Sequence, residues 1–370
     1  MKHVSSQANI LCIAGGGTGG HVMPALALAD AARERWGDLQ VDFIGAERGL
    51  EATLLPKRGE HVLLLHMHAV QGVNILRKLI VLGWEIPRAV WRIRQQWKIR
   101  RPTLLVGVGG YASATGVLAA IISRVPVVLY EQNAIPGLVN RRLARFCQRI
   151  MLGFADAQAH LPADKCVHTG NIVRKEIVGI TWQAHTPPCL LVLGGSQGAM
   201  FLNQTVPQAC SLLQQAGYNF TIQHICGGDD ALKQRIESTY QQANITAQVT
   251  NFCHDMPNFY AAGDMMIARS GAMTVAEASI VGMPTMFVPL PHAADQHQTW
   301  NARSLCNHQA AIMVEQHDTQ AADLADKLKL TLFNHHVLQE MSHKARQLAV
   351  TDAQERQLQA LSPWLLGGQS

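Results

Sequence analysis

Short apolar runs alternate with longer stretches of mixed polarity along the whole chain. In the first half these runs predict strands at 10–14, 41–44, 61–65, 103–108, 126–130 and 149–152. In the second half they predict strands at 189–193, 220–225, 248–252, 265–268 and 284–288. Strands that alternate with helix-length segments are typical of a parallel sheet covered on both faces. The pattern therefore predicts an α/β protein with two Rossmann-like domains, connected through the polar, proline-bearing stretch 166–188.

Two glycine-rich loops follow the first strand of each half, Gly15–Gly20 after 10–14 and Gly194–Gly198 after 189–193. Such a turn, when it opens a helix, brings bare backbone N–H groups and the positive end of the helix dipole to one point, which suits a phosphate. Two such turns indicate two nucleotide-type half-domains.

The first loop alone also fits the dinucleotide fingerprint, with Gly15, Gly17 and Gly20 at its offsets. Glycines at these places serve equally for close packing of a helix on a strand. The ribose-binding acid of that fingerprint would be Glu47, which comes later than the usual spacing of about 20 residues. A nicotinamide oxidoreductase is therefore an alternative, but it assigns no function to the second glycine loop.

The composition narrows the class of protein. The chain has 370 residues, of which 48% are hydrophobic and 15% charged, which suits two ordinary domains and excludes a largely disordered protein. No apolar run reaches the roughly 18 residues that span a bilayer, and no secretory signal precedes the first strand, so we expect a cytoplasmic protein. The eight cysteines form no Cys-x-x-Cys pair and are expected to be buried, reduced thiols. The net charge of +5 is modest, and we expect no nucleic-acid partner.

Tryptophans and large aliphatic residues mix with many cations in the stretch 75–101, which includes Trp84, Trp91 and Trp97. Part of this stretch must belong to the core. If the remaining apolar side chains are exposed, the stretch is suited to dip into anionic lipid. The arginines at 141, 142, 145 and 149 either extend this surface or form a solvated helix face.

Polar residues follow the strands of the predicted sheets, where ligands bind in open α/β proteins. His21 stands at the start of a helix, where the dipole favours the neutral imidazole, and it serves either as a general base or as a hydrogen-bond partner of a loop carbonyl. Glu131 orients an acceptor, acts as a second base, or pairs with a nearby arginine.

Two further motifs have both a structural and a functional interpretation. Thr274 and Glu277 match the Ser/Thr-x-x-Glu capping box, yet a helix start also offers donors to phosphate, and a glutamate one turn later accepts from ribose hydroxyls. Ser196 is either an N-cap or a phosphate contact. The histidines at 61, 66 and 68 have no cysteine or acid nearby in the sequence to complete a ligand set, so we expect no zinc site.

Taken together, these motifs closely resemble those of the MurG family of bacterial glycosyltransferases, nearly from end to end of the chain. The motifs are Gly16–His21, Gly109–Ser113, Glu131–Asn133, Gly194–Ala199, Arg269–Ala272 with Thr274 and Glu277, and His297–Gln298. The resemblance implies a GT-B fold, in which two Rossmann-like domains with parallel sheets face a central cleft. It implies an acceptor and membrane-facing domain at 1–166, rejoined by a C-terminal helix at 353–370, and a donor domain at 167–352.

The resemblance also implies an activity. It is the inverting transfer of N-acetylglucosamine from UDP-N-acetylglucosamine to the muramyl hydroxyl of lipid I (undecaprenyl-pyrophosphoryl-N-acetylmuramyl-pentapeptide), giving lipid II for peptidoglycan. Members of the family are peripheral membrane proteins on the cytoplasmic face of the bacterial inner membrane. Anionic lipid and cell-wall or division proteins are therefore expected partners. No metal cofactor is expected, because oriented amides and a helix terminus stabilise the UDP leaving group. Alternatives are a UDP-N-acetylglucosamine 2-epimerase of the same fold and an inactive scaffold of the cell-wall machinery.

By the same resemblance each motif receives a role. His21 and Glu131 are the catalytic candidates, with His21 as the leading general base. The residues expected to bind UDP-N-acetylglucosamine are Thr18, Gly19, Gly20, Asn133, Arg174, Ser196, Cys253, Ala272, Met273, Thr274, Val275, Ala276, Glu277 and Gln298. Within this set, Glu277 takes the ribose, Ser196 and the 272–274 turn take the diphosphate, and Asn133 with Gln298 takes the sugar.

The acceptor is expected at Gly17, Tyr111 and Ser113, beside Thr18 and His21. The chain departs from the family pattern at two positions. Tyr130 stands where the family usually has histidine, and Ile172 where it usually has proline.

Overall fold

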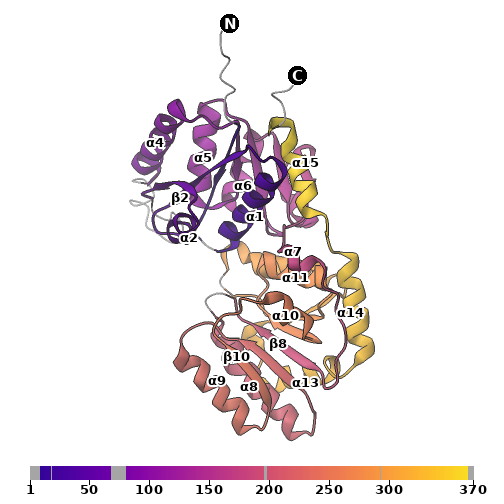
Figure 1. Cartoon of the computed structure of the whole chain (residues 1–370). Coiled ribbons are helices and arrows are strands. Elements are labelled where there is room, and N and C mark those ends of the chain that lie inside the picture. Colours follow the sequence, from indigo (N-terminus) through magenta and orange to yellow (C-terminus); the bar gives the residue numbers. More distant parts are fainter. Residues whose placement is uncertain (1–8, 18, 68–80, 196–197, 292, 366–370) are drawn as a thin grey trace. The chain divides into compact units, whose positions relative to one another are not determined.

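The structure, a computed structural model, describes residues 9–17, 19–67, 81–195, 198–291 and 293–365. It consists of two compact units (Figure 1). Unit 1 extends to Ile172 and resumes at Asp352, and unit 2 is Val173–Thr351. The boundary expected at 166–167 falls inside strand β7 (Cys166–His168), which pairs with β6 (Arg149–Leu152) of unit 1. The division therefore lies further along the chain, after Ile172.

Unit 1 contains a parallel sheet of seven strands in the order β3-β2-β1-β4-β5-β6-β7. The other strands are β1 (Ile10–Ala14), β2 (Gln40–Ala46), β3 (His61–Leu65), β4 (Leu104–Gly107) and β5 (Val127–Glu131). The first six follow the strand order of a dinucleotide-binding sheet, in which ligands bind outside the strand ends where the order reverses, here between β1 and β4. His21 follows β1, and Gly109 follows β4.

Helices cover both faces of the unit 1 sheet. Leu11 and Ile13 of β1 lie in a core cluster with α1 and α15, whereas Cys12 and Ala14 lie in a second cluster with α4 and α5. This alternation is expected of a strand that is buried on both sides. The helices and helical turns are α1 (Gly19–Arg35), α2 (Glu51–Lys57), η1 (Val81–Glu85), α4 (Ile86–Ile99), α5 (Gly110–Ile122), α6 (Leu138–Leu143), η2 (Ala144–Phe146), η3 (Ala155–His160), η4 (Ala163–Lys165) and α15 (Ala353–Leu365).

Unit 2 contains a parallel sheet of six strands in the order β10-β9-β8-β11-β12-β13, which repeats the reversal seen in unit 1. The strands are β8 (Cys189–Leu193), β9 (Thr221–Ile225), β10 (Thr246–Thr250), β11 (Met265–Ala268), β12 (Thr285–Phe287) and β13 (Ala311–Met313). The helices and helical turns are α7 (Lys175–Val178), α8 (Met200–Gln215), α9 (Asp230–Gln242), α10 (Met256–Ala261), α11 (Ala272–Val281), η5 (Ala294–Gln296), α12 (His297–Cys306), η6 (Gln316–Asp318), α13 (Ala321–Thr331) and α14 (His335–Gln347).

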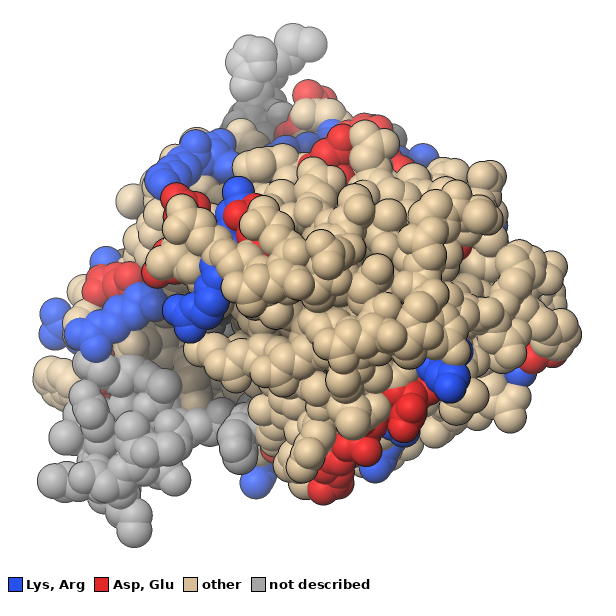
Figure 2. Space-filling view, turned by 90° about the horizontal axis from the view of Figure 1, so that it is seen from below, with Lys and Arg blue, Asp and Glu red and all other residues tan. Residues whose placement is uncertain are grey.

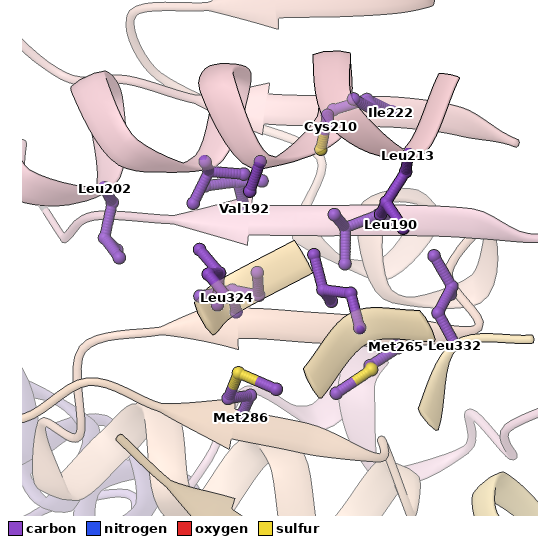
Figure 3. Close-up of a cluster of buried hydrophobic side chains, with 14 of the residues drawn as sticks. Leu190, Val192, Leu202, Cys210, Leu213, Ile222, Met265, Met286, Leu324 and Leu332 are labelled. Atoms are coloured by element: carbon purple, nitrogen blue, oxygen red, sulfur yellow. The ribbon is translucent and has the colours of Figure 1, made fainter. Parts of the chain in front are cut away.

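A buried apolar cluster joins β8 of unit 2 to its covering helices (Figure 3). Leu190 and Val192 of the strand pack with Leu202 and Leu213 of α8 and with Leu324 of α13. Truncating one such leucine to alanine costs about 2–5 kcal/mol of stability. This cluster anchors the strand whose end carries the second glycine loop.

The predicted α/β class with two parallel sheets is confirmed. The two strands that the apolar pattern did not predict are β7 and β13, which have three residues each and lie at the edges of their sheets. Strand β10 begins and ends two residues earlier than the expected 248–252, so Phe252 lies beyond it.

None of the described helices is long and apolar enough to cross a bilayer. Each of the eight cysteines is a free thiol, and most are buried, as predicted. Figure 2 shows one face of the molecule, on which most residues are uncharged. Among the described residues of that face, Lys and Arg lie beside Asp and Glu.

Candidate active site

The first glycine turn of unit 1 packs directly against the turn that follows β4. Gly15 donates its amide to the Ile44 carbonyl at 3.0 Å, and a Cβ on Gly15 would overlap Val108. Gly110 is equally confined, since a Cβ there would lie 2.7 Å from the Gly16 carbonyl oxygen. Because β1 and β4 are neighbours, the two turns form one surface at the carboxyl edge of the sheet.

His21 lies at this junction, in the first turn of α1. Its imidazole faces Gly109, because a Cβ on Gly109 would lie 2.8 Å from Nε2. Gly109 has φ of 100°, a conformation that favours glycine. Tyr111, in the first turn of α5, is partly buried. The structure thus places His21 beside the turn that carries Tyr111.

The other residues expected to bind substrate in unit 1 differ in accessibility. Gly17 and Gly20 are exposed, and Gly19 is partly buried. Ser113 is fully buried, with its hydroxyl against Gly107 near the end of β4. Thr18 lies outside the described residues, and so does Ser196 of unit 2.

Glu131 organises the turn that follows β5. Its Oε1 accepts hydrogen bonds from the backbone amide of Asn133 at 3.0 Å and from its side-chain amide at 3.2 Å. Its Oε2 accepts from the Gly137 amide at 3.0 Å and from Asn140 Nδ2 at 2.8 Å. A carboxylate that accepts four hydrogen bonds from its own turn stabilises the conformation of that turn. Glu131 therefore orients Asn133, and its role as a second base stays a prediction.

The two departures from the family pattern meet in one buried cluster. Tyr130 is fully buried, and its hydroxyl donates to Asn171 Oδ1 at 2.9 Å. Burial raises the pKa of Tyr130, and hydrogen bonds from the Gln357 side chain and from the backbone of Ile172 oppose this rise. A proline at position 172 would have no N–H to donate. The tyrosine and the isoleucine therefore complement one another, and position 130 belongs to the core.

In unit 2 the second glycine turn rests on a neutral hydrogen-bonded network. Gly198 packs so closely on the Cys226 carbonyl oxygen that a Cβ would overlap it. Asn203 Nδ2 donates to that carbonyl at 2.9 Å, so its Oδ1 accepts from His224 Nε2 at 3.0 Å. His224 Nδ1 then accepts from the Tyr240 hydroxyl at 3.0 Å. Burial lowers the pKa of His224 to about 3, so the network carries no charge at neutral pH.

Helix α11 begins at the carboxyl edge of the unit 2 sheet, directly after β11. Its N-cap is Gly271, which forms no side-chain cap, so no capping side chain takes up the amides of the first turn. Thr274 is therefore inside the helix, and the capping box that its spacing to Glu277 suggested does not form. Val275 is fully buried and its amide donates to the Gly271 carbonyl, whereas Met273 and Ala276 are partly exposed. The positive end of the α11 dipole points to this edge.

Glu277 is buried on α11 between a tyrosine and an arginine. It is 8% exposed, and its Oε2 accepts from the Tyr260 hydroxyl at 2.9 Å. Burial raises the pKa of the Glu277 carboxyl, while Arg174 and the Tyr260 hydrogen bond oppose this rise. The structure therefore brings together Arg174 and Glu277, which are far apart in sequence. It adds Tyr260, which sequence reasoning missed because no motif surrounds it.

The remaining donor candidates follow neighbouring strands of unit 2. Beyond β10, Phe252 is 57% exposed, and its ring meets that of His254 edge-on at 4.8 Å. Cys253 between them is partly buried. Gln298 stands in the first turn of α12, where its Oε1 accepts from the Leu290 amide at 3.0 Å. Its carbonyl oxygen is thus engaged in shaping the loop after β12.

Two of the histidines considered for zinc have an acidic neighbour that the sequence did not predict. His61 Nδ1 lies 3.0 Å from Asp42 Oδ1, and His66 Nδ1 lies 2.7 Å from Glu47 Oε2. The residue at 68 lies outside the described residues. Within the described ranges, no three His, Cys, Asp or Glu side chains come together as a metal-ligating group. Glu47, the acid that the dinucleotide fingerprint would use, is instead paired with His66.

Comparison with known proteins adds evidence independent of this geometry. Residues 11–152 match the glycosyltransferase family 28 N-terminal domain, and residues 189–357 match the glycosyltransferase family 28 C-terminal domain. The chain is 39% identical over 350 residues to a protein of Psychromonas ingrahamii, a match that covers 93% of this chain and 96% of the relative. That relative is named UDP-N-acetylglucosamine--N-acetylmuramyl-(pentapeptide) pyrophosphoryl-undecaprenol N-acetylglucosamine transferase.

Solved structures show the same likeness. The crystal structure of Acinetobacter baumannii MurG matches with a TM-score of 0.78 at 31% identity, over 95% of this chain and 98% of that one. A UDP-N-acetylglucosamine 2-epimerase structure from Listeria monocytogenes matches with a TM-score of 0.64 at 13% identity, over 97% and 96% of the two chains. The second match shows a shared fold alone.

Proposed function

Because the chain belongs to glycosyltransferase family 28, we propose that it transfers N-acetylglucosamine from UDP-N-acetylglucosamine to the muramyl hydroxyl of undecaprenyl-pyrophosphoryl-N-acetylmuramyl-pentapeptide, giving lipid II. Relatives that carry this transfer in their names align over nearly the whole chain at 39–41% identity. The fold is the two-domain GT-B type. The 2-epimerase alternative has only a distant structural match in its favour.

The reaction is an inverting displacement at the anomeric carbon. The muramyl oxygen attacks that carbon from the face opposite UDP, and its proton passes to His21. The bond from the carbon to the β-phosphate oxygen breaks, and UDP leaves with the electron pair. His21 suits this role because it stands at the start of α1 with its imidazole toward the Gly109 turn, at the edge where ligands bind.

The observation that carries the donor assignment is the start of α11. Its first-turn amides have no capping side chain, and the buried Glu277 carboxylate lies one turn along the helix. Amides and a helix dipole suit a diphosphate, and a carboxylate accepts from ribose hydroxyls. Arg174 adds a cation close enough to interact with the charge of Glu277. We therefore place the diphosphate at Ala272–Thr274 and the ribose at Glu277.

The experiment that tests this function follows radiolabelled N-acetylglucosamine from its UDP carrier into a short-chain lipid I analogue. We expect label in the lipid product and almost no UDP release when the acceptor is left out. Conversion of the UDP-sugar to its 2-epimer without acceptor would instead support the epimerase. Absence of both products would contradict the proposed function.

We also propose that part of the stretch 75–101 docks on the membrane. Trp84, in η1, is 66% exposed, and Trp91, in α4, is 59% exposed. Arg88 is also exposed and lies one turn before Trp91 on the same face of α4. Trp97 is in the core, and Arg100 pairs with Asp42, so only part of the stretch is available. Residues 75–80 lie outside the described residues. Tryptophans beside cations are suited to anionic interfaces.

Vesicle sedimentation tests this surface. We expect binding to vesicles that contain phosphatidylglycerol, weaker binding to pure phosphatidylcholine, and loss of binding in a Trp84→Ala, Trp91→Ala double variant. Ile122→Ala, which truncates an exposed apolar residue on α5, is the control and should bind normally. Equal binding by the double variant would remove this surface from the proposal. Association with cell-wall and division proteins stays a prediction of the resemblance.

A further inference from the structure

The buried carboxylate of Glu51 packs against the first glycine turn and accepts one of its amides. Glu51 opens α2 and is 1% exposed. Its Oε2 accepts the Gly17 amide at 2.8 Å, and its Oε1 accepts the Ala46 amide at 2.9 Å. The glycine turn therefore already donates one of its amides to an acid of its own chain.

Three glycines from separate elements make room for this side chain. A Cβ on Gly16, in the turn after β1, would overlap the Glu51 carboxyl group. The same is true of Gly49, which precedes α2, and a Cβ on Gly45, near the end of β2, would lie 2.5 Å from Glu51 Cγ. Contacts this close on three sides mean that the acid is built into the turn.

We propose that Glu51 is a positioning residue that occupies the anion position of the first glycine turn. The proposal rests on the function proposed above and specifies what the turn receives. A phosphate on the Gly17 amide would approach the Glu51 carboxylate, and like charges at such distances repel. The turn therefore takes a neutral part of the acceptor, and the pyrophosphate of the acceptor binds elsewhere.

The same contacts link Glu51 to the general base. By holding Gly17, the carboxylate fixes the backbone just before α1, and His21 stands in the first turn of that helix. Small displacements of reacting groups cost up to about 100-fold in rate. Glu51 thus acts through the position of His21 and of the acceptor, without touching the reacting atoms.

Steady-state kinetics of Glu51→Gln test the positioning role. This variant keeps the side-chain volume but places an amide NH2 against one of the two backbone N–H groups. We expect kcat/KM for the lipid acceptor to fall about 10–100-fold, with the donor KM unchanged within about twofold.

Glu60→Gln is the matched control, because Glu60 is a similarly buried acid of unit 1 that pairs with Arg33 instead of the turn. It should lower the melting temperature without changing either KM. An unchanged acceptor kcat/KM in Glu51→Gln, or a rise of the donor KM as large as the effect on the acceptor, would overturn the positioning role.

Inorganic pyrophosphate tests the occupied anion position. With UDP at saturation, pyrophosphate should not raise the melting temperature of the wild-type protein further. Glu51→Ala should gain about 3 °C at ten times its Kd for pyrophosphate, because the turn then lacks its internal anion. Glu51→Gln is measured in the same way if the alanine variant does not fold.

An equal rise in the wild-type protein, or no rise in either variant, would contradict the occupied position. This measurement needs no sugar transfer, so its failure is distinct from failure of the proposed function. The latter would appear as wild-type protein that releases no label to the lipid analogue.

Discussion

The two glycine-rich turns look alike in sequence but have opposite kinds of support. In unit 1 the Glu51 carboxylate accepts the Gly17 amide directly. In unit 2, Gly198 packs on a carbonyl that is held by Asn203, and Asn203 is held by a neutral His224. A charged support and an uncharged one lie beneath turns of similar composition.

We propose that this difference suits the two turns to different ligands. An internal anion uses part of the positive field of a helix start, so less remains for a phosphate. A neutral network adds no opposing charge. Helix α11, which begins at the carboxyl edge of the same sheet, adds first-turn amides that no side chain caps. Unit 2 is therefore the side suited to a nucleotide diphosphate, and unit 1 the side suited to the attacking hydroxyl.

The largest effect that this comparison predicts is on the chemical step in unit 1. His21→Ala should lower kcat by about 100-fold or more, because the attacking hydroxyl loses its base. The donor KM should stay nearly constant, since the donor contacts proposed at α11 belong to unit 2. His66→Ala, an exposed histidine paired with Glu47, is the control. A near-normal kcat in His21→Ala, measured with the lipid acceptor, would assign the base to another residue.

A smaller effect is expected on donor binding in unit 2. Glu277→Ala should raise the donor KM about 10-fold or more, because a hydrogen bond to a charged group is worth about 1.5–3 kcal/mol. Tyr260→Phe keeps the carboxylate and removes only its hydroxyl partner at 2.9 Å, so it should raise the donor KM less. Titration of UDP-N-acetylglucosamine at a saturating acceptor concentration measures both. An unchanged KM in Glu277→Ala would separate the ribose from this residue.

The sequence predicted the framework of this comparison but not the supports. Both glycine loops, eleven of the strands and the α11 start follow from local patterns, because apolar runs and glycines act through neighbouring residues. Glu51 carries no such signal, since its partners come from the turn after β1 and the end of β2. The same holds for Tyr260, which meets Glu277 only through packing of α10 and α11.

Two sequence motifs show a related limit. The spacing of Thr274 and Glu277 matches a capping box, but the helix begins at Ala272, so the spacing was coincidental. Glu131 ends its strand, a place typical of ligand-binding residues, and its oxygens accept hydrogen bonds from Asn133, Gly137 and Asn140. A sequence motif predicts where in the fold a residue lies, whereas its role also depends on hydrogen-bond partners that the motif does not show.

The neutral support in unit 2 predicts a dependence of stability on pH. The pKa of His224 is lowered to about 3 from its usual 6.5, so between these values the unfolded chain binds a proton that the folded one does not. Its contribution is therefore fully present above about pH 6.5 and is lost at roughly 1.4 kcal/mol per pH unit as the pH falls. Denaturant titrations between about pH 6.5 and 5 should show this slope in wild-type protein and a flatter one in His224→Gln.

His336→Gln, which changes an exposed histidine on α14, is the control and should keep the wild-type slope. Parallel pH profiles for wild-type and His224→Gln would mean that the network tolerates a charged imidazole. The second turn would then resemble the first in having an ionic support, and the contrast between the two units would lose its electrostatic basis.

The smallest expected effect is that of metal removal. If uncapped amides and the α11 dipole supply the positive field for the UDP diphosphate, a divalent cation adds little to leaving-group stabilisation. We therefore propose that turnover in EDTA equals turnover in magnesium within about twofold, whereas a cation that bridges the phosphates would supply several kcal/mol to the transition state. A large loss in EDTA that magnesium restores would show that neutral support and helix dipole are insufficient, and that unit 2 binds its diphosphate as a metal complex.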